Sequence, residues 1–443
     1  MVLKLVIAAT ALVMMLLAVT KVPLRYNARN VAVRWKTTAM TALAFTVVIG
    51  LLTVMLGFVN GMYQLTLHSG QPGNVIVLSD RATDEVVSNL LPTDVGDLER
   101  QPGILRDGDR PMASRETYFV VNQPLRNARA GRPGRRFVQV RGLDDPELSA
   151  RVHGLEMLPG GQWFSSAGVR EAADAGDPRQ RELVEAVLGE GVAGELGRDR
   201  DPATAASWRR PDRLDVGDTF PLGGRTWVVA GVLNSGGSTF NSEVWAKRSL
   251  MGGMFGKDTY TSLVCRTADA ESARKLKEFF TTQYRKSSVL AQVETDYYES
   301  LSNTNKQFLY AIAFVTAVMA IGGAFGVMNT MFAAISQRIR DIGVLRLLGY
   351  RRRQILVSFL LESLIIALVG GLAGCALGYL ANGLSATSIV NAGPGGGKSV
   401  VLRLIIDARI LGVGFLLAIA MGLLGGLIPS LSAMRLKPLE SLR

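Results

Sequence analysis

Histidine and cysteine are scarce in this sequence. Its 443 residues include two histidines, His68 and His153, and two cysteines, Cys265 and Cys375. Cys265 lies in a polar region and Cys375 in an apolar block, so the sequence contains no disulfide framework and no Cys/His zinc spacing. Each histidine stands alone, which favours a surface or packing role. Because no G-x-S-x-G or H-E-x-x-H pattern occurs either, we predict neither catalytic nor metal-binding residues.

Long apolar runs, by contrast, are abundant. Hydrophobic residues make up 48% of the chain, and the mean hydropathy is +0.23. A membrane-spanning helix needs ~20 mostly apolar residues. The sequence therefore predicts a membrane protein with an α-helical transmembrane bundle and a large extracytoplasmic mixed α/β domain. The five predicted spans are residues 3–20, 38–60, 308–334, 354–383 and 408–431.

The net charge of +12 is explained by the loops between these spans. Residues 21–37, 335–353 and 432–443 are rich in Lys and Arg. Because such loops stay in the cytoplasm, we expect the N-terminus outside and the C-terminus inside, and no nucleic-acid partner. A cleaved signal peptide at the first block is the alternative. Cleavage would place the five cations of residues 21–37 outside the membrane, against the rule that basic loops stay in the cytoplasm. No A-x-A cleavage site ends the block either, so we favour an uncleaved anchor.

The region between the second and third spans has the sequence pattern of an α/β domain, with predicted strands and amphipathic helices. Strands are predicted at GNVIVLS (73–79), at RRFVQVRGLD (135–144) and on both sides of the Gly-Gly turn in residues 214–237. Amphipathic helices are predicted at 177–197 and 270–288. Residues 61–69 and 295–307 contain helix formers and adjoin spans. We expect both to continue the span helices outward as stalks.

The stretch NAGPGGGKSV (391–400) matches a loose P-loop pattern, A-x-x-x-x-G-K-S. A working P-loop needs a buried strand before it and a helix after it. Here the following residues, VVLRLII, read as a strand, and the predicted topology places the stretch outside, away from ATP. We therefore interpret it as an extracytoplasmic turn.

Between the third and fourth spans lies ISQRIRDIGVLRLLGYRRRQI (335–355). Its apolar residues recur every three or four positions, which predicts a helix with one apolar face, and Gly349 fits its C-terminal cap. Periodicity alone does not separate an interfacial helix with solvated charges from a docking helix. The apolar residues are Ile335, Ile339, Ile342, Leu345 and Leu348.

Residues 329–374 resemble the signature of the MacB/FtsX-like permease family of ABC transporters. The matching residues are Asn329, Gln337, Arg338, Arg340, Asp341, Ile342, Gly343, Arg346, Leu348, Gly349 and Glu362. Asp341 replaces the usual Glu, and Tyr350 the usual Ala. The chain end IPSLSAMRLKPLESLR (428–443) also resembles the family's terminus.

The resemblance implies a division of the chain. Residues 1–20 are an extra N-terminal transmembrane anchor, and residues 21–60 are a basic cytoplasmic segment and the second span. Residues 61–307 are a periplasmic MacB-like domain with stalk ends. Residues 308–443 are an FtsX-like permease domain with three spans. Residues 336–349 form its cytoplasmic coupling helix.

The resemblance also implies a mechanism and partners. A separate cytoplasmic ABC ATPase binds ATP and Mg²⁺, and this chain holds no cofactor. Closure of the ATPase moves the periplasmic domain, which exports a substrate or extracts it from the membrane. A second permease copy pairs with the first, as a homodimer or heterodimer, in the lipid of the inner membrane. A periplasmic adaptor and an outer-membrane channel are further expected partners. The residues expected at the ATPase contact are Arg338, Ile339, Arg340, Asp341, Ile342, Gly343, Leu345, Arg346 and Gly349.

Inside the membrane, an acid such as Glu362 is energetically costly, and we expect it to pair with a cation or polar group near the cytoplasmic side, such as Arg346 or Asn329. Proton relay is the alternative role. Five glycines are expected to permit close helix packing: Gly371, Gly374, Gly378, Gly422 and Gly426.

Two functions compete with transport. A regulatory transducer would use the same machine to activate a cell-wall hydrolase. Because regulatory members of the family usually have a smaller outer domain, residues 61–307 favour transport. A membrane-tethered enzyme with its active site in residues 61–307 is disfavoured, because no catalytic set is present there.

Overall fold

The computed structural model describes residues 35–67, 69–124, 135–171, 182–200, 208–301, 303–390 and 398–435. The chain divides into two compact units. The helical unit comprises the described parts of residues 1–61, 307–384 and 403–443. The sheet unit comprises those of residues 62–306 and 385–402. The predicted first span (3–20), the glycine-rich run at 391–397 and the chain end at 436–443 lie outside the described residues.

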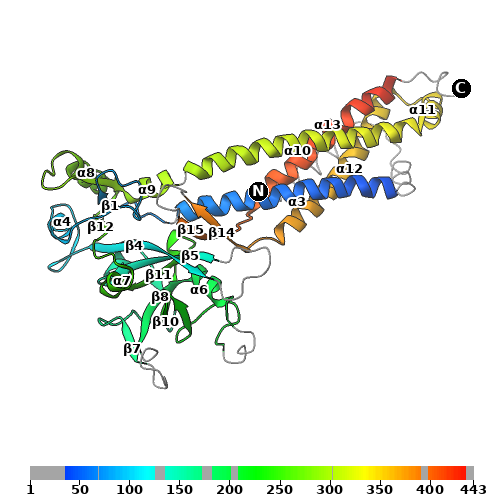
Figure 1. The fold of residues 1–443 in the computed structure, drawn as a ribbon. Helices are drawn as coiled ribbons and strands as arrows, with labels where there is room; N and C mark the ends of the chain where they lie inside the picture. The colour runs from blue at the N-terminus through cyan, green and yellow to red at the C-terminus, as the bar shows by residue number, and fades with distance from the viewer. Residues whose placement is uncertain are drawn as a thin grey trace. The chain divides into compact units, whose positions relative to one another are not determined.

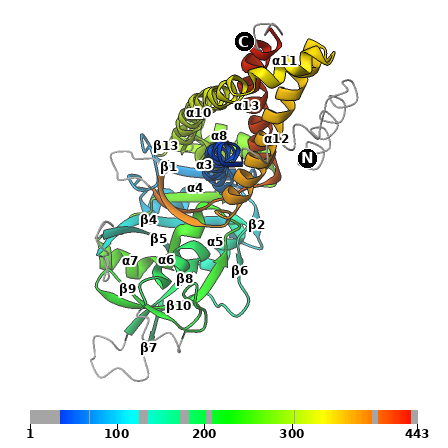
Figure 2. The same ribbon diagram turned by 90° about the vertical axis from the view of Figure 1, so that its right-hand side faces the viewer.

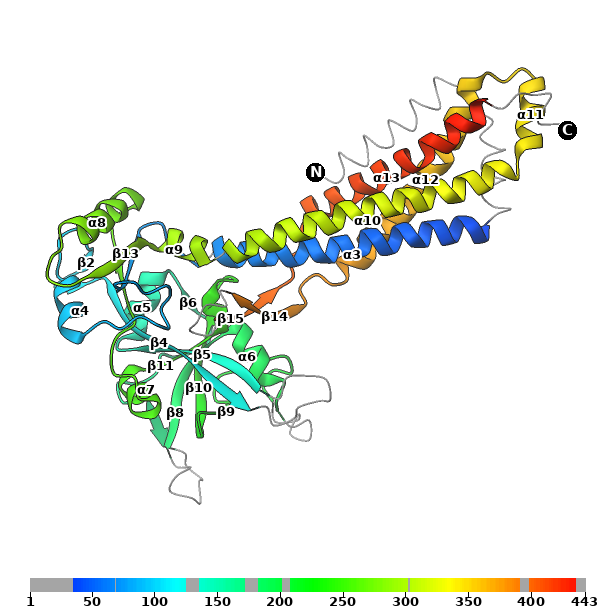
Figure 3. The same ribbon diagram turned by 45° about the horizontal axis from the view of Figure 1, so that its top comes forward.

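Four helices in the described part of the chain are long and apolar enough to cross a membrane. They confirm the predicted second to fifth spans to within a few residues, and Figure 3 shows them as long rods. The second span's helix continues to Leu67, as the stalk prediction requires. These helices are α3 (Trp35–Leu67), α10 (Asn303–Ser336), α12 (Arg352–Tyr379) and α13 (Ala408–Arg435).

Helices α12 and α13 lie side by side in the helical unit (Figure 2). Its core contains Phe45 and Ile49 of α3, Phe359 of α12 and Phe415 of α13, all nearly inaccessible. Helix α10 is far more exposed than the others. Between α12 and α13 the chain forms the paired strands β14 (Ser385–Val390) and β15 (Lys398–Arg403), so the strand predicted after the glycine-rich run is confirmed.

An 11-stranded sheet is the centre of the sheet unit as described (Figure 1). Its strand order is β13-β1-β12-β4-β5-β11-β8-β10-β6, with β7 beside β8 and β9 beside β10. The pairs β5/β11 and β8/β10 are parallel, and the other pairs are antiparallel. The strands are β1 (Asn74–Ser79), β4 (Ala113–Pro124), β5 (Arg135–Leu143), β6 (Glu156–Met157), β7 (Val169–Glu171), β8 (Glu182–Gly189), β9 (Thr219–Leu222), β10 (Arg225–Asn234), β11 (Glu243–Lys247), β12 (Ser262–Arg266) and β13 (Val289–Val293).

Short helices connect and cover these strands, and a two-stranded ribbon, β2 (Arg106–Asp107) and β3 (Arg110–Pro111), precedes β4. Helix α8 confirms the helix predicted at 270–288, and its N-cap Asp269 accepts a hydrogen bond from the backbone of Ser272. The helices are α4 (Pro92–Leu98), α5 (Pro146–His153), α6 (Glu190–Gly197), η3 (Thr239–Ser242), α7 (Arg248–Phe255), α8 (Ala270–Thr282) and α9 (Glu294–Leu301).

The helix predicted over residues 177–197 is wrong in its first part. Residues 177–181 lie outside the described residues; of the described part, residues 182–189 form β8 and residues 190–197 form the helix α6. Strand β8 lies between β10 and β11, and every residue from Val184 to Gly189 is buried. Burial of consecutive residues is what an interior strand requires, and it outweighs the helix-forming composition of ELVEAVLG.

Candidate functional site

A short turn joins α10 to α11 (Ile339–Leu347), the helix within the predicted coupling segment. Helix α10 ends at Ser336, and the backbone N–H of Arg338 donates to the carbonyl of Ile335 at 2.9 Å to close the turn. Gly349 follows α11 with φ of +92°, a left-handed conformation that glycine adopts without strain. The segment 336–349 is therefore a helix end, a turn and a nine-residue helix.

Arg338 and Glu362 form a buried ion pair between the start of α11 and α12. The guanidinium donates from Nη1 to Oε2 at 2.8 Å and from Nη2 to Oε1 at 3.0 Å. Both side chains are almost fully buried. The expected pairing of Glu362 with a cation is therefore confirmed, but the partner is Arg338 and not Arg346 or Asn329. The turn before α11 brings Arg338 to Glu362, whereas Asn329 is exposed on α10.

Burial of the Arg338–Glu362 pair leaves one face of α11 covered by the helical unit and another exposed. Arg338, Ile342 and Gly343 are buried within the helical unit, so they do not offer a docking surface in this structure. The exposed apolar side chains are Val344, Leu347 and Leu348, at 45%, 61% and 72% exposure. We call these three residues the open face of α11.

The other residues predicted at the ATPase contact differ in how far they are exposed to solvent. Ile339, Leu345 and Arg346 are half-buried, and Arg340 is exposed. The Nε of Arg346 is buried without a hydrogen-bond partner among the described residues. The side chain of Asp341 lies outside the part that the structure describes.

The five predicted packing glycines all face neighbouring helices. A Cβ added at Gly374 would lie 2.8 Å from the Cβ of Ile49, and one at Gly378 would lie 2.6 Å from that of Thr53, both on α3. Such distances leave no room for a side chain. Between α12 and α13, Gly371 faces Ala418, Gly422 faces Ala367 and Gly426 faces Ser363.

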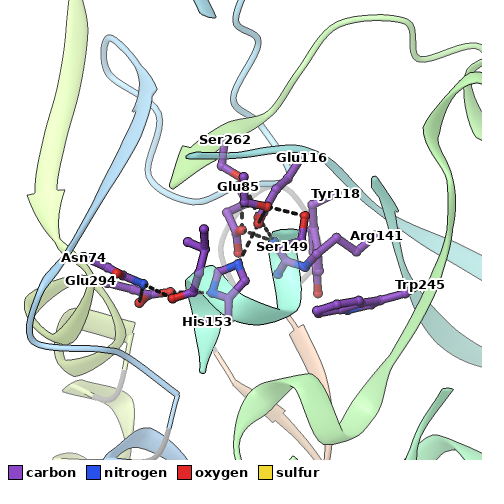
Figure 4. A network of polar contacts seen from close by, with 12 residues as sticks. Asn74, Glu85, Glu116, Tyr118, Arg141, Ser149, His153, Trp245, Ser262 and Glu294 are labelled. Carbon is purple, nitrogen blue, oxygen red and sulfur yellow. Dashed lines mark hydrogen bonds and ion pairs between the residues drawn. The ribbon is translucent and has the colours of Figure 1, made fainter. Parts of the chain in front are cut away.

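The sheet unit contains a second group of buried charges, drawn in Figure 4. It joins two cations to four carboxylates, and each residue is at most 3% exposed. Its members come from β4, β5, β11, the last residue of α5, the first residue of α9 and the segment between β1 and α4. We call it the buried polar cluster: Glu85, Glu116, Arg141, His153, Glu243 and Glu294.

Arg141 is the centre of one half of the cluster. Its Nε and Nη2 donate to Glu243 at 2.6 and 2.7 Å, and its Nη1 donates to Glu85 at 2.8 Å and to Glu116. The guanidinium also lies 5.0 Å from the ring centre of Tyr118. Burial alone would lower the pKa of Arg141, but the surrounding carboxylates raise it well above its usual value.

His153 is the centre of the other half. Its Nε2 lies 2.6 Å from Oε1 of Glu116, and its Nδ1 lies 2.9 Å from Oε1 of Glu294. Burial alone would lower the pKa of His153, but the two carboxylates outweigh burial and raise that pKa to about 10. The pKa of Glu116 is lowered, because Arg141 and His153 outweigh the effect of burial.

Sequence reasoning missed this cluster and assigned His153 a surface or packing role. Its six members are spread from residue 85 to residue 294, and no local motif joins them. In the structure, Glu116 and Arg141 occupy buried positions of β4 and β5, next to apolar residues such as Tyr118 and Val140. In the described residues, no group of three or more His, Cys, Asp or Glu is arranged to hold a metal ion.

Two family models match the chain. The model described as FtsX-like permease C-terminal matches residues 313–438. The model described as MacB-like periplasmic core domain matches residues 38–282, more than half of the chain.

Curated relatives agree with these matches. The chain is 23% identical to the macrolide export ATP-binding/permease protein MacB of Burkholderia lata, over 81% of this chain and 47% of that protein. It is 29% identical to the uncharacterized ABC transporter permease YknZ of Bacillus subtilis, over 51% of this chain and 57% of that protein. The chain spans about half the length of the curated relatives that it matches.

Two solved structures also match part of the chain. The periplasmic region of MacB from Actinobacillus actinomycetemcomitans is 14% identical, covers 52% of this chain and 93% of that chain, and has a TM-score of 0.33. The extracellular domain of YknZ is 14% identical, covers 49% and 99%, and has a TM-score of 0.30.

The two family models divide the chain between them in the order that the sequence motifs indicated. Four helices of the described residues are apolar and long enough to span a membrane, as a permease requires. The chain therefore belongs to the MacB/FtsX-like family of ABC transporter permeases, and it is a multi-pass inner-membrane protein.

Proposed function

We propose that this chain is the permease subunit of an ABC transporter that converts closure of a separate cytoplasmic ATPase into motion of the sheet unit outside the membrane. The motion exports a substrate or extracts it from the membrane or periplasm. Family membership supports the transporter assignment, and the names of several relatives pair ATP binding with permease function. We propose that ATP and Mg²⁺ bind to the ATPase subunit.

The open face of α11 is the observation that carries this proposal. Its three apolar side chains lie at the C-terminal end of a short helix between two spans, and the basic residues around it predict that this end faces the cytoplasm. Exposed Arg340 lies on the same helix, and Arg351–Arg353 follow it. An apolar centre with a basic rim fits a partner groove that is apolar with acidic edges. The Arg338–Glu362 pair fixes α11 to α12, so a push on this helix reaches a membrane span.

An ATPase-binding experiment tests the proposal. The chain is co-expressed with the ABC ATPases of its source, and ATP turnover and co-purification are measured for Leu347→Asp and for Leu347→Met as the matched control. A charge in place of an apolar anchor at an interface costs about 2 kcal/mol or more, equivalent to roughly 30-fold weaker binding. Undiminished binding of the Asp variant would reject the open face as the contact.

A second measurement concerns nucleotide itself. The purified chain alone is expected to show no ATP hydrolysis, and Lys398→Ala is expected to leave the turnover of the complex unchanged. Turnover that disappears with Lys398→Ala would place ATP hydrolysis on this chain. The second permease copy, the periplasmic adaptor, the outer-membrane channel and the orientation of the termini stay predictions.

A further inference from the structure

Two of the chain segments that connect the sheet unit to the span helices, those next to α3 and α10, meet at Glu294. We call residues 69–74, which follow α3, and helix α9, which precedes α10, the two stalk roots. Oε2 of Glu294 accepts hydrogen bonds from the backbone N–H of Gln71 and from Nδ2 of Asn74, both at 2.9 Å. Gly70 lies so close to α9 that a Cβ there would be 2.8 Å from Cα of Thr295. One buried carboxylate therefore holds both roots together.

The other oxygen of Glu294 is bound by His153, and the hydrogen bonds define the charge of this imidazole. A carboxylate only accepts hydrogen bonds, and a neutral imidazole has a single N–H to donate. Because His153 has a carboxylate at each ring nitrogen, both bonds form only when both nitrogens carry a proton. With both carboxyl groups ionised, this geometry is that of an imidazolium, and the lowered pKa of Glu116 and the raised pKa of His153 agree with it.

The surroundings of His153 are closed on every side. The rings of Phe240 and Trp245 have centroids 4.6 and 6.5 Å from that of the imidazole. Ser114 donates to Glu116 at 2.6 Å. The titratable and charged groups of the elements packed here are Glu116 and Tyr118 of β4, Arg141 of β5, Glu243 of β11, Tyr297 and Tyr298 of α9, and Glu85.

A continuous series of charge-assisted contacts extends from the stalk roots into the sheet. Glu294 binds His153, His153 binds Glu116, Glu116 binds Arg141, and Arg141 binds Glu243 of β11. Each contact is buried, so displacing one member would leave an unpaired charge away from water, which is strongly unfavourable. Such a series resists sliding of the roots over the sheet more than apolar packing does.

We propose that His153, as a buried imidazolium, is the positioning residue that locks both stalk roots to the central sheet, so that the roots and the sheet move as one rigid body. The proposal deepens the proposed function, because motion of the span helices would reach the sheet through this lock.

The charge of His153 is tested by nitrogen NMR on the full chain in lipid nanodiscs. The chain has only two histidines, so His68→Gln leaves a single histidine signal. With ¹⁵N-labelled histidine we expect both ring nitrogens of His153 to be protonated at pH 7.5 and to titrate at about pH 10. An imidazole with one protonated nitrogen at pH 7.5 overturns the proposal.

The locking role is tested by distances between spin labels within one chain, diluted with unlabelled chains. Cysteines replace the exposed Ser300 of α9 and Arg225 of β10, in a background with Cys265→Ala and Cys375→Ala. We expect one narrow distance distribution with and without trapped nucleotide, and a roughly two-fold broader one in His153→Gln. An equally narrow distribution in His153→Gln contradicts the lock. If His153→Gln fails to fold, Glu294→Gln replaces it, and we expect the same broadening of the distance distribution.

Two controls separate this inference from the proposed function. Leu188→Ala weakens the sheet core without touching the cluster, so its distribution is expected to stay narrow. A second label pair, Ser300 in two permease copies with their ATPase, reports transmitted motion. If nucleotide leaves the distance between the two Ser300 labels unchanged in the otherwise wild-type chain, the proposed function fails. The lock is judged separately, by the distance between the labels at Ser300 and Arg225 within one chain.

Discussion

The helical unit and the sheet unit both bury charge, but they do so on different scales. The helical unit pairs one arginine with one glutamate, Arg338 with Glu362. The sheet unit assembles four carboxylates around Arg141 and His153. Removing one partner from either group leaves an uncompensated buried charge. The comparison teaches that a single pair fixes one helix to another, whereas a network fixes several strands and helices at once.

Substitution of Arg141 is expected to give the largest effect. Arg141→Met leaves Glu85 and Glu243 without a cation and Glu116 with His153 alone. The free energy of unfolding of the sheet unit should therefore fall by about 5 kcal/mol or more. Urea unfolding followed by the fluorescence of buried Trp227 and Trp245 measures this loss. Arg151→Met is the matched control, because Arg151 pairs with Asp107 at the surface and should cost under about 1 kcal/mol. Similar losses in both variants would remove the distinction between network and surface pair.

The pH dependence of the sheet unit gives the next effect. The folded pKa of His153 is about 10, above its unfolded value of about 6.5, so its contribution is complete below pH 6.5 and is lost as the pH rises through 10. At about 1.4 kcal/mol per pKa unit, the complete loss is on the order of 5 kcal/mol. Urea unfolding between pH 6 and 10 measures it. We expect His153→Gln to flatten the slope and His68→Gln to retain it; a flat profile in the unmodified chain contradicts the imidazolium.

The single pair of the helical unit should give a smaller effect. Glu362→Gln keeps a hydrogen-bond acceptor for Arg338 but removes the charge, and we expect a loss of about 1–3 kcal/mol in the stability of the helical unit. Thermal unfolding in nanodiscs measures this loss. Charge exchange in the double variant Arg338→Glu/Glu362→Arg should recover part of it. No recovery would indicate that the surroundings, rather than the pairing, set the cost.

Glycine packing should give the smallest effect. Gly374→Ala places a Cβ 2.8 Å from Ile49 Cβ, which should destabilise the helical unit by about 1–2 kcal/mol. Gly326→Ala is the control, because a Cβ there meets nothing within 4 Å in the described structure, and alanine favours the helix by up to about 1 kcal/mol. The same thermal unfolding distinguishes them, and equal responses would mean that α3 and α12 do not pack closely at Gly374.

The span helices and several strands of the sheet unit were predictable from local pattern. A run of ~20 apolar residues is sufficient to identify a span, and the Gly223-Gly224 turn correctly indicated the hairpin of β9 and β10. Residues 182–189 were not predictable in the same way, because their helix-forming composition was overruled by neighbours on both sides. The sequence did not show that Ile342 of the predicted apolar stripe is buried while Leu348 is exposed, because periodicity identifies an apolar stripe but not which part of it the protein itself covers.

The sequence by itself determined the membrane class, four of the spans as described, the domain order and the family, because these depend on local composition and on motifs of contiguous residues. Only the tertiary structure decided that Glu362 pairs with Arg338 and that His153 joins Glu116 to Glu294. These contacts connect residues 24 to 141 positions apart. The physical reason is that a buried charge takes whichever opposite charge the packed backbone brings within reach, and no local pattern encodes that choice.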